Sequence, residues 1–192
     1  MLNATSPCLD TFCRLDRLGL TVLSQQVEPE HSVLVCAPTT DPTPCPGCGQ
    51  AGVRHDTVVR DLAHVPYGWK PTILQVRVPR YRCRGCRRTW RHCIKPAAPG
   101  RGKLSRDAIT MAVKSIVIDR LSIARTAAQL GVGWNTASDA ILAAATDWLF
   151  TDPQRLDGVT TVGVDEHVVR HEALLYRMEV GDLHWLAVVA AE

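Results

Sequence analysis

Long apolar runs are missing from this sequence, and so is the pattern of a secretory signal. No run among its 192 residues approaches the roughly 18 apolar residues that a membrane helix needs. Residues 1–10 also lack a basic region followed by an apolar segment. We therefore expect no membrane partner and a cytoplasmic location, where reducing conditions let paired thiols bind metal rather than oxidise.

Acidic residues are missing from the thirty residues between Arg77 and Arg106. The net charge of +3 conceals this bias, because the stretch holds eleven of the 22 lysines and arginines and no aspartate or glutamate. A solvated basic face is the alternative, but a soluble surface usually mixes the two signs. A block of one sign suits a polyanion whose phosphates it can neutralise with release of counterions. The sequence therefore predicts contact with nucleic acid. The candidate DNA-binding residues of this stretch are Arg80, Arg82, Arg84, Arg87, Arg88, Arg91, Arg101 and Lys103.

Cysteines occur in two pairs with the same internal spacing, Cys45-Pro-Gly-Cys48 and Cys83-Arg-Gly-Cys86. Each such turn directs two sulfurs at one point, and two turns supply the four thiolates of a closed tetrahedral zinc site. Two disulfides or a redox pair are the alternatives. We expect structural Zn²⁺, with no open position for chemistry. The remaining cysteines, expected to be small buried or spare thiols, are Cys8, Cys13, Cys36 and Cys93.

Strand patterns precede and surround the two cysteine pairs. We expect an N-terminal strand-containing segment, 1–38, and a zinc-ribbon-like module, 39–94, that needs its metal to fold. The expected strands are 20–27, 32–37, 57–62 and 72–81. A basic linker rich in proline and glycine, 95–103, follows the module.

The apolar period changes from two to 3.6 after the linker, which predicts an all-α domain over 104–150. Ser105 is placed to cap a helix over 106–119, and Ser122 to cap the next helix. These helices can form either a DNA-binding helix-turn-helix or an ordinary αα-hairpin.

The helix after Gly131 carries the candidate recognition surface. Gly131 permits a tight turn, and the small side chains of Ala137 and Ala140 are expected to face inward. Asp139 argues against a phosphate contact unless it accepts from a cytosine amino group. The candidate DNA contacts on the opposite face are Trp134, Asn135, Thr136 and Ser138.

Strand patterns return over 160–169, 174–180 and 183–190, which predicts antiparallel strands of an incomplete domain, 158–192. Asp165 lies in the middle of the first strand. It is either a carboxylate in water or in a salt bridge, or a ligand for Mg²⁺. Such a magnesium site needs more carboxylates than the chain places convincingly. The expected fold class is α+β and multidomain.

The order of these parts resembles the ISL-three family of insertion-sequence transposases. The motifs are Cys-Pro-Gly-Cys, Arg80-Tyr-Arg-Cys-Arg-Gly-Cys-Arg-Arg-Thr-Trp90, the helix-turn-helix pattern, and Val-Gly-Val-Asp-Glu-His around Asp165. The resemblance implies that a zinc finger and a helix-turn-helix over 122–142 recognise the terminal inverted repeats of the element. An RNase H-like domain of the DDE type is implied to follow. The resemblance makes Cys45, Cys48, Cys83 and Cys86 the zinc ligands and Asp165 the first catalytic acid.

The expected function is that of the N-terminal part of a transposase, which binds double-stranded DNA at the inverted repeats for transposition. With one acid of the triad, the chain is not expected to catalyse strand transfer alone, and Mg²⁺ is expected only in a complete catalytic domain. The alternative is a transcriptional regulator with a zinc ribbon, a helix-turn-helix and a C-terminal dimerisation sheet. The target sequence and the formation of a homo-oligomer on DNA stay open.

Overall fold

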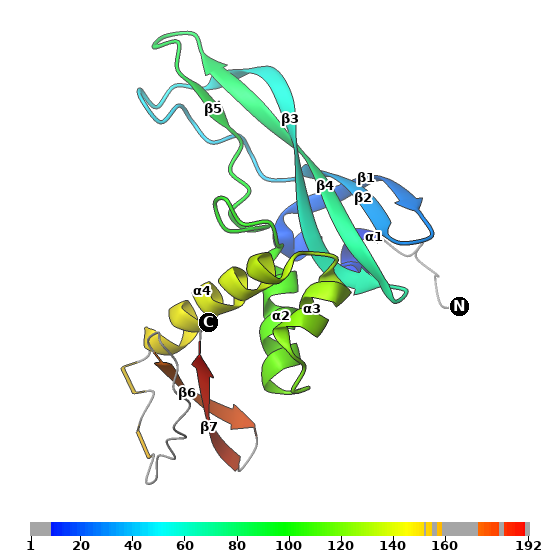
Figure 1. The fold of residues 1–192 in the computed structure, drawn as a ribbon. Coiled ribbons are helices and arrows are strands. Elements are labelled where there is room, and N and C mark those ends of the chain that lie inside the picture. The colour runs from blue at the N-terminus through cyan, green and yellow to red at the C-terminus, as the bar shows by residue number, and fades with distance from the viewer. Residues whose placement is uncertain (1–8, 152, 155–156, 159–172, 181–182, 191–192) are drawn as a thin grey trace, which may run out of the picture. The chain divides into compact units, whose positions relative to one another are not determined.

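The computed structural model describes residues 9–151, 153–154, 157–158, 173–180 and 183–190. The chain divides into two compact units, Met1–Ile141 and Leu142–Glu192. Figure 1 shows their elements, and each unit is described by itself. The elements form an α+β mixture, as the sequence predicts.

The first unit contains two short N-terminal turns of helix, five strands and three further helices, the last of which continues into the second unit. The elements are α1 (Leu9–Phe12), the 3₁₀ turn η1 (Asp16–Leu18), β1 (Leu20–Val27), β2 (Ser32–Pro38), β3 (Gly52–Tyr67), β4 (Lys70–Cys83), β5 (Thr89–Arg91), α2 (Arg106–Val117), α3 (Ile123–Leu130) and α4 (Trp134–Phe150).

The strands form one mixed sheet in the order β1-β2-β4-β3, with β5 paired to β4. β1 and β2 are antiparallel, and so are β3 and β4, whereas β2 and β4 run parallel. The segment 1–38 and the zinc-ribbon-like module 39–94 therefore share one sheet. The expected strands 20–27, 32–37, 57–62 and 72–81 lie within the first four strands, whereas β5 has no counterpart among them. The parallel pairing of β2 with β4 joins segments that are far apart in sequence.

The long hairpin of β3 and β4 is the main feature of the unit, and its two ends differ. Its inner end turns through Gly68 and Trp69, which both have positive φ (62° and 67°), as in the primed turns that suit twisted hairpins. The hydrophobic core lies near this end and includes Leu62, Leu74 and Val76, each 0% exposed. At the outer end most side chains of β3 are exposed.

The N-terminal segment completes the core at the inner end. Leu15, Leu18 and Leu20 pack into the same cluster as Cys13 and Cys36. Burial raises the pKa of the Cys36 thiol to about 12, which keeps it protonated and unreactive.

The segment expected as a linker, 95–103, packs against the sheet. Ala97 is fully buried, and the Arg60 guanidinium donates to the carbonyl oxygens of Pro99 (2.8 Å) and Gly102 (2.6 Å). Leu104, which follows the segment, forms an isolated bridge with Ala63 of β3. The helices that follow are thus attached to the sheet through hydrogen-bonded backbone.

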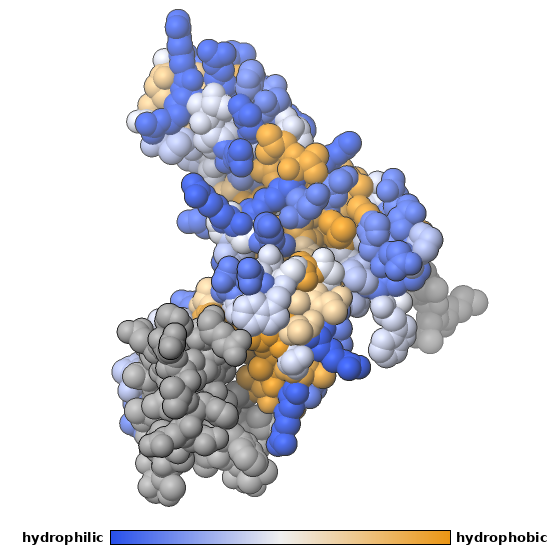
Figure 2. Space-filling view, viewed as in Figure 1, coloured by the Kyte–Doolittle hydropathy of each residue, from blue (hydrophilic) through white to orange (hydrophobic). Residues whose placement is uncertain are grey.

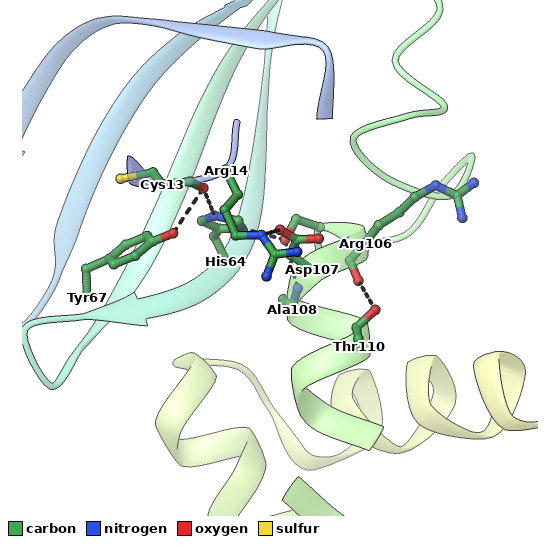
Figure 3. Close-up of polar contacts among 9 residues, drawn as sticks. Cys13, Arg14, His64, Tyr67, Arg106, Asp107, Ala108 and Thr110 are labelled. Carbon is green, nitrogen blue, oxygen red and sulfur yellow. Dashed lines mark hydrogen bonds and ion pairs between the residues drawn. The ribbon is translucent and has the colours of Figure 1, made fainter. Parts of the chain in front are cut away.

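A buried hydrogen-bond network fixes the start of α2 on β3 (Figure 3). His64 Nδ1 lies 2.7 Å from Ser105 Oγ, which accepts from the Ala108 N–H as the N-cap of α2. Tyr67 donates its hydroxyl to the Cys13 carbonyl at 3.0 Å, and the same carbonyl lies 3.4 Å from His64 Nε2. An ion pair between Arg14 and Asp107 lies beside this network.

The helix starts agree with the sequence analysis. Ser105 caps α2 and Ser122 caps α3, each accepting a backbone N–H. α2 ends at Val117 rather than Asp119. Gly131, at φ 66°, ends α3 in the left-handed conformation that glycine favours.

The second unit contains the end of α4 and an antiparallel hairpin of β6 (Ala173–Val180) and β7 (Leu183–Ala190). These strands agree with the last two that the sequence predicts. The expected strand 160–169 and its Asp165 lie outside the described residues. Among the described residues, no helix has the length and apolar character that crossing a membrane requires.

Candidate metal centre and nucleic-acid interface

The four paired cysteines come together at the outer end of the β3–β4 hairpin. Their sulfur atoms all lie within 4.8 Å of one another. The Sγ atoms of Cys45 and Cys86 are 3.4 Å apart, and those of Cys48 and Cys83 are also 3.4 Å apart. Four sulfurs bound tetrahedrally to Zn²⁺ at about 2.3 Å stand about 3.8 Å from each other. The cluster therefore fits zinc, and all four thiols are free of disulfides.

The two cysteine turns have the same local backbone geometry. We call residues 45–50 the first knuckle and residues 83–88 the second knuckle. The Cys45 N–H donates to the Gln50 carbonyl at 2.9 Å, and the Cys83 N–H donates to the Arg88 carbonyl at the same distance. The Gly47 N–H also points at Cys45 Sγ, 3.4 Å away. These closed turns hold each pair of sulfurs on one side of its backbone.

The protonation of the cluster favours a bound cation. Burial opposes ionisation of Cys45, but the N–H groups of Gly47 and Cys48 stabilise its thiolate and lower its pKa to about 6. The Cys86 N–H is the largest influence on Cys83 and lowers the pKa of that thiol. The Gln50 N–H favours the thiolate of Cys48, yet the surrounding thiols and burial raise its pKa to about 11. A divalent metal ion removes this conflict, because coordinated thiols are deprotonated.

Each knuckle is covered by a side chain from the other. A Cβ atom added to Gly47 would lie 3.3 Å from Arg88 Nη1, and one added to Gly85 would lie 2.5 Å from Gln50 Oε1. The space above both glycines is thus already filled. Trp90 continues this packing, because its ring lies against Gly52 and its indole N–H donates to the Thr43 carbonyl at 3.1 Å.

The basic residues predicted to contact DNA surround the second knuckle and continue toward α2. Figure 2 shows mainly hydrophilic residues over the outer end of the hairpin. Arg80 is half-buried and forms an ion pair with Asp56, with Nε 3.2 Å from Oδ1. It is therefore partly neutralised. The exposed members of the set are Arg82, Arg84, Arg87, Arg88, Arg91, Arg101 and Lys103.

The residues predicted on the outward face of α4 do not all lie there. Trp134 is 44% exposed and Asn135 is exposed, whereas Thr136 is half-buried. Ser138 is only 6% exposed, so it does not lie on the outward face where the sequence analysis places it.

The buried face of α4 is centred on other residues than the sequence predicts. The sequence predicts that Ala137 and Ala140 face inward, but Ile141 is buried and Ala140 only half-buried. Successive residues of a helix are about 100° apart. Moving the centre of the buried face from Ala140 toward Ile141 brings Ser138 inside.

Sequence reasoning missed three residues of β3 that lie beside the second knuckle: Val53, Arg54 and His55. They fall outside the acid-free stretch between Arg77 and Arg106, and no motif marks them. The pairing of Arg54 with Tyr81 brings them to the basic residues of β4. Only the strand register could have revealed this.

The geometry defines a four-cysteine zinc ribbon. Residues 41–86 match the family described as the zinc-finger of transposase IS204/IS1001/IS1096/IS1165. The matched segment contains the first knuckle and all four clustered cysteines, and it ends at residue 86, inside the second knuckle and before α2. No curated protein matches the chain, and no solved structure matches it.

Proposed function

We propose that this protein binds double-stranded DNA at the terminal inverted repeats of an insertion sequence, as the DNA-binding part of a transposase. One observation carries the proposal. The second knuckle, which the metal would hold rigid, carries exposed arginines, among them Arg84 inside the matched segment and Arg87 directly after it. A fixed group of cations suits the regular spacing of DNA phosphates.

The helices would supply the second contact. α3, the turn at Gly131 and α4 have the order and spacing of a helix-turn-helix. Trp134 and Asn135 are the exposed residues at the start of α4 and would approach the bases if this helix enters a major groove. The hydrogen bond between His64 and Ser105 fixes α2 on β3. The zinc ribbon and α2 would therefore contact DNA as one rigid unit.

We also propose a catalytic role for one acidic residue, Asp165. In a DDE domain this carboxylate would be the first of three that hold Mg²⁺. Hard cations of this kind prefer carboxylate oxygens. This proposed role of Asp165 does not depend on whether the zinc ribbon binds DNA.

A transcriptional regulator is the competing function. The antiparallel hairpin of β6 and β7 is the feature that favours it, since the edge of a small sheet can pair with the same edge of a second copy.

The test uses the zinc-loaded full chain and short duplexes that tile the DNA on both sides of its own coding sequence. Binding is measured by fluorescence anisotropy, and bound duplexes are then footprinted. The transposase proposal expects two protected sites, one at each side, with inverted copies of one sequence. A single protected site upstream of the gene would support the regulator and contradict the transposase. Absence of binding to every duplex would contradict both.

A further inference from the structure

The strongest unassigned feature is a pocket beside the second knuckle, at the outer end of β3 and β4. Its volume is about 330 Å³, and its residues come from three places in the sequence. The lining consists of Val53, Arg54 and His55 of β3, Arg82 and Cys83 of β4, and Arg84 and Arg87 of the knuckle. We propose that this pocket binds a phosphate group of the DNA backbone. The inference rests on the proposed DNA binding and names a contact within it.

A β-bulge builds one wall of the pocket. Arg54 pairs with Tyr81 and Asp56 pairs with Arg80, so His55 is an extra residue without a partner of its own on β4. In a regular strand, successive side chains point to opposite faces. A bulge breaks this alternation and redirects side chains, and here three successive residues of β3 line one pocket.

Apart from the Cys83 sulfur, which would bind the metal, the charged side chains of the lining all have one sign. Four arginines line the pocket and no carboxylate does. The nearest acid along β3, Asp56, is already paired with Arg80. Among the described residues, no ion pair is formed by any of the four lining arginines. An anion in the pocket would relieve their mutual repulsion, which a neutral ligand would not.

Hydrogen-bond donors remain available for an anion. Arg54 uses Nη2 to donate to Thr57 Oγ1 at 2.9 Å, and its other guanidinium nitrogens donate to no other side chain or carbonyl among the described residues. The guanidinium fork matches two oxygens of a phosphate at once. Arg82, Arg84 and Arg87 are exposed, so the pocket can receive a phosphate that is part of a longer chain.

The backbone at Arg87 gives independent support. Arg87 follows Cys86 with φ 60°, and Gly49 follows Cys48 in the first knuckle with φ 73°. The turn thus requires a left-handed residue at both places. A side chain is sterically disfavoured in that conformation, whereas glycine is not. The first knuckle avoids the cost with glycine, whereas the second accepts it and thereby places a guanidinium on the pocket.

The test compares two arginine variants with a matched control. Arg54→Gln removes a charge from the pocket, and Arg87→Gly removes one where glycine suits the backbone. Arg77→Gln removes the same charge from an exposed position on β4 that does not line the pocket. The zinc-loaded full chains are titrated with two duplexes of about 30 base pairs and unrelated sequence, over a series of salt concentrations.

Loss of one phosphate contact should reduce the slope of log K against log salt by about one and weaken binding about tenfold. Arg54→Gln and Arg87→Gly should both show this on both duplexes, while Arg54→Lys should retain the salt slope. Arg77→Gln should keep the slope of the unaltered protein. The zinc content of each variant is measured as well. If one pocket variant loses its zinc, the salt slope of the other pocket variant is used to test the inference.

Two results would overturn the inference while leaving DNA binding intact. Slopes that are equal for the pocket variants and the unaltered protein would remove the phosphate contact. Weakening on only one of the two duplexes would indicate a base contact instead. If the unaltered protein binds neither these duplexes nor any duplex that tiles the DNA beside its coding sequence, the proposed function itself fails. Binding to tiled duplexes alone would overturn the phosphate contact, because contacts to phosphate do not depend on sequence.

Discussion

The two ends of the β3–β4 hairpin are held by different forces. The inner end lies in an apolar core with Leu62, Leu74 and Val76 and is linked by hydrogen bonds to the start of α2. The outer end has mostly exposed side chains, and of its four clustered cysteines only Cys45 and Cys83 are buried. One continuous hairpin thus passes from a region that burial stabilises to one that needs metal. The outer end, which lacks an apolar core, is also the end that carries the exposed arginines.

The largest expected effect is loss of the metal. Cys86→Ser removes one of four ligands, so bound zinc should fall from about one equivalent to near none, and the outer end should unfold. Hydrogen exchange should then be fast in residues 45–56 and 80–91 but remain slow around Leu62 and Leu74. Zinc analysis and exchange mass spectrometry measure the two results.

Cys93→Ser is the matched control, because Cys93 is half-buried and lies outside the sulfur cluster. It should keep the zinc and the exchange pattern. Loss of protection over the whole sheet in Cys86→Ser would contradict the difference between the two ends.

A smaller effect is expected from exchanging residues between the knuckles. Gly49→Arg places a side chain at φ 73°, which costs roughly 1–2 kcal/mol. Because folding and metal binding are coupled here, zinc affinity should fall about tenfold. Arg87→Gly, the reverse change at the equivalent position, should leave zinc affinity undiminished. Competition with a chromophoric chelator measures both.

The predicted asymmetry would be wrong if both substitutions weakened zinc binding equally. In that case Arg87 would contribute to the metal site, and its left-handed backbone would need no role in DNA binding.

The inner end should respond to pH through His64. Burial lowers the pKa of His64 below its ordinary value of 6.5, although the Cys13 carbonyl and Asp107 act in the opposite direction. The folded state therefore resists protonation. The stabilising contribution is complete above 6.5 and is lost as pH falls from 6.5 toward the lower folded pKa.

His64→Asn keeps a polar group near Ser105 but does not titrate. Denaturation of the zinc-loaded chains at neutral and mildly acidic pH should show a larger loss of unfolding free energy for the unaltered protein than for His64→Asn. Acid also removes zinc from both proteins, so the difference between their losses reports the contribution of His64. Equal losses would show that folding does not lower the pKa of His64.

The sequence predicted what local chemistry determines. The knuckle spacing identified the metal cluster, alternation identified β1 and most of β4, and Ser105 and Ser122 marked two helix starts. It missed what depends on distant contacts. The parallel pairing of β2 with β4 and the bulge that brings Arg54 to the second knuckle have no local signal. Ser138 was misplaced because alanines indicate the buried face of a helix poorly.

The smallest expected effect concerns the contact between the knuckles. Gly85→Ala would bring a Cβ to 2.5 Å from Gln50 Oε1, at the flexible end of a side chain. The side chain can move, so the cost should be below about 1 kcal/mol. In a protein that already carries Gln50→Ala, Gly85→Ala should cost less free energy. The double-mutant cycle should therefore show coupling between Gly85→Ala and Gln50→Ala. Gly47→Ala is the comparison. Its Cβ would lie 3.3 Å from Arg88 Nη1, so this substitution should cost less free energy than Gly85→Ala in the unaltered protein. Additive effects of Gly85→Ala and Gln50→Ala on zinc affinity would show that the knuckles do not pack on each other. The metal alone would then hold them together.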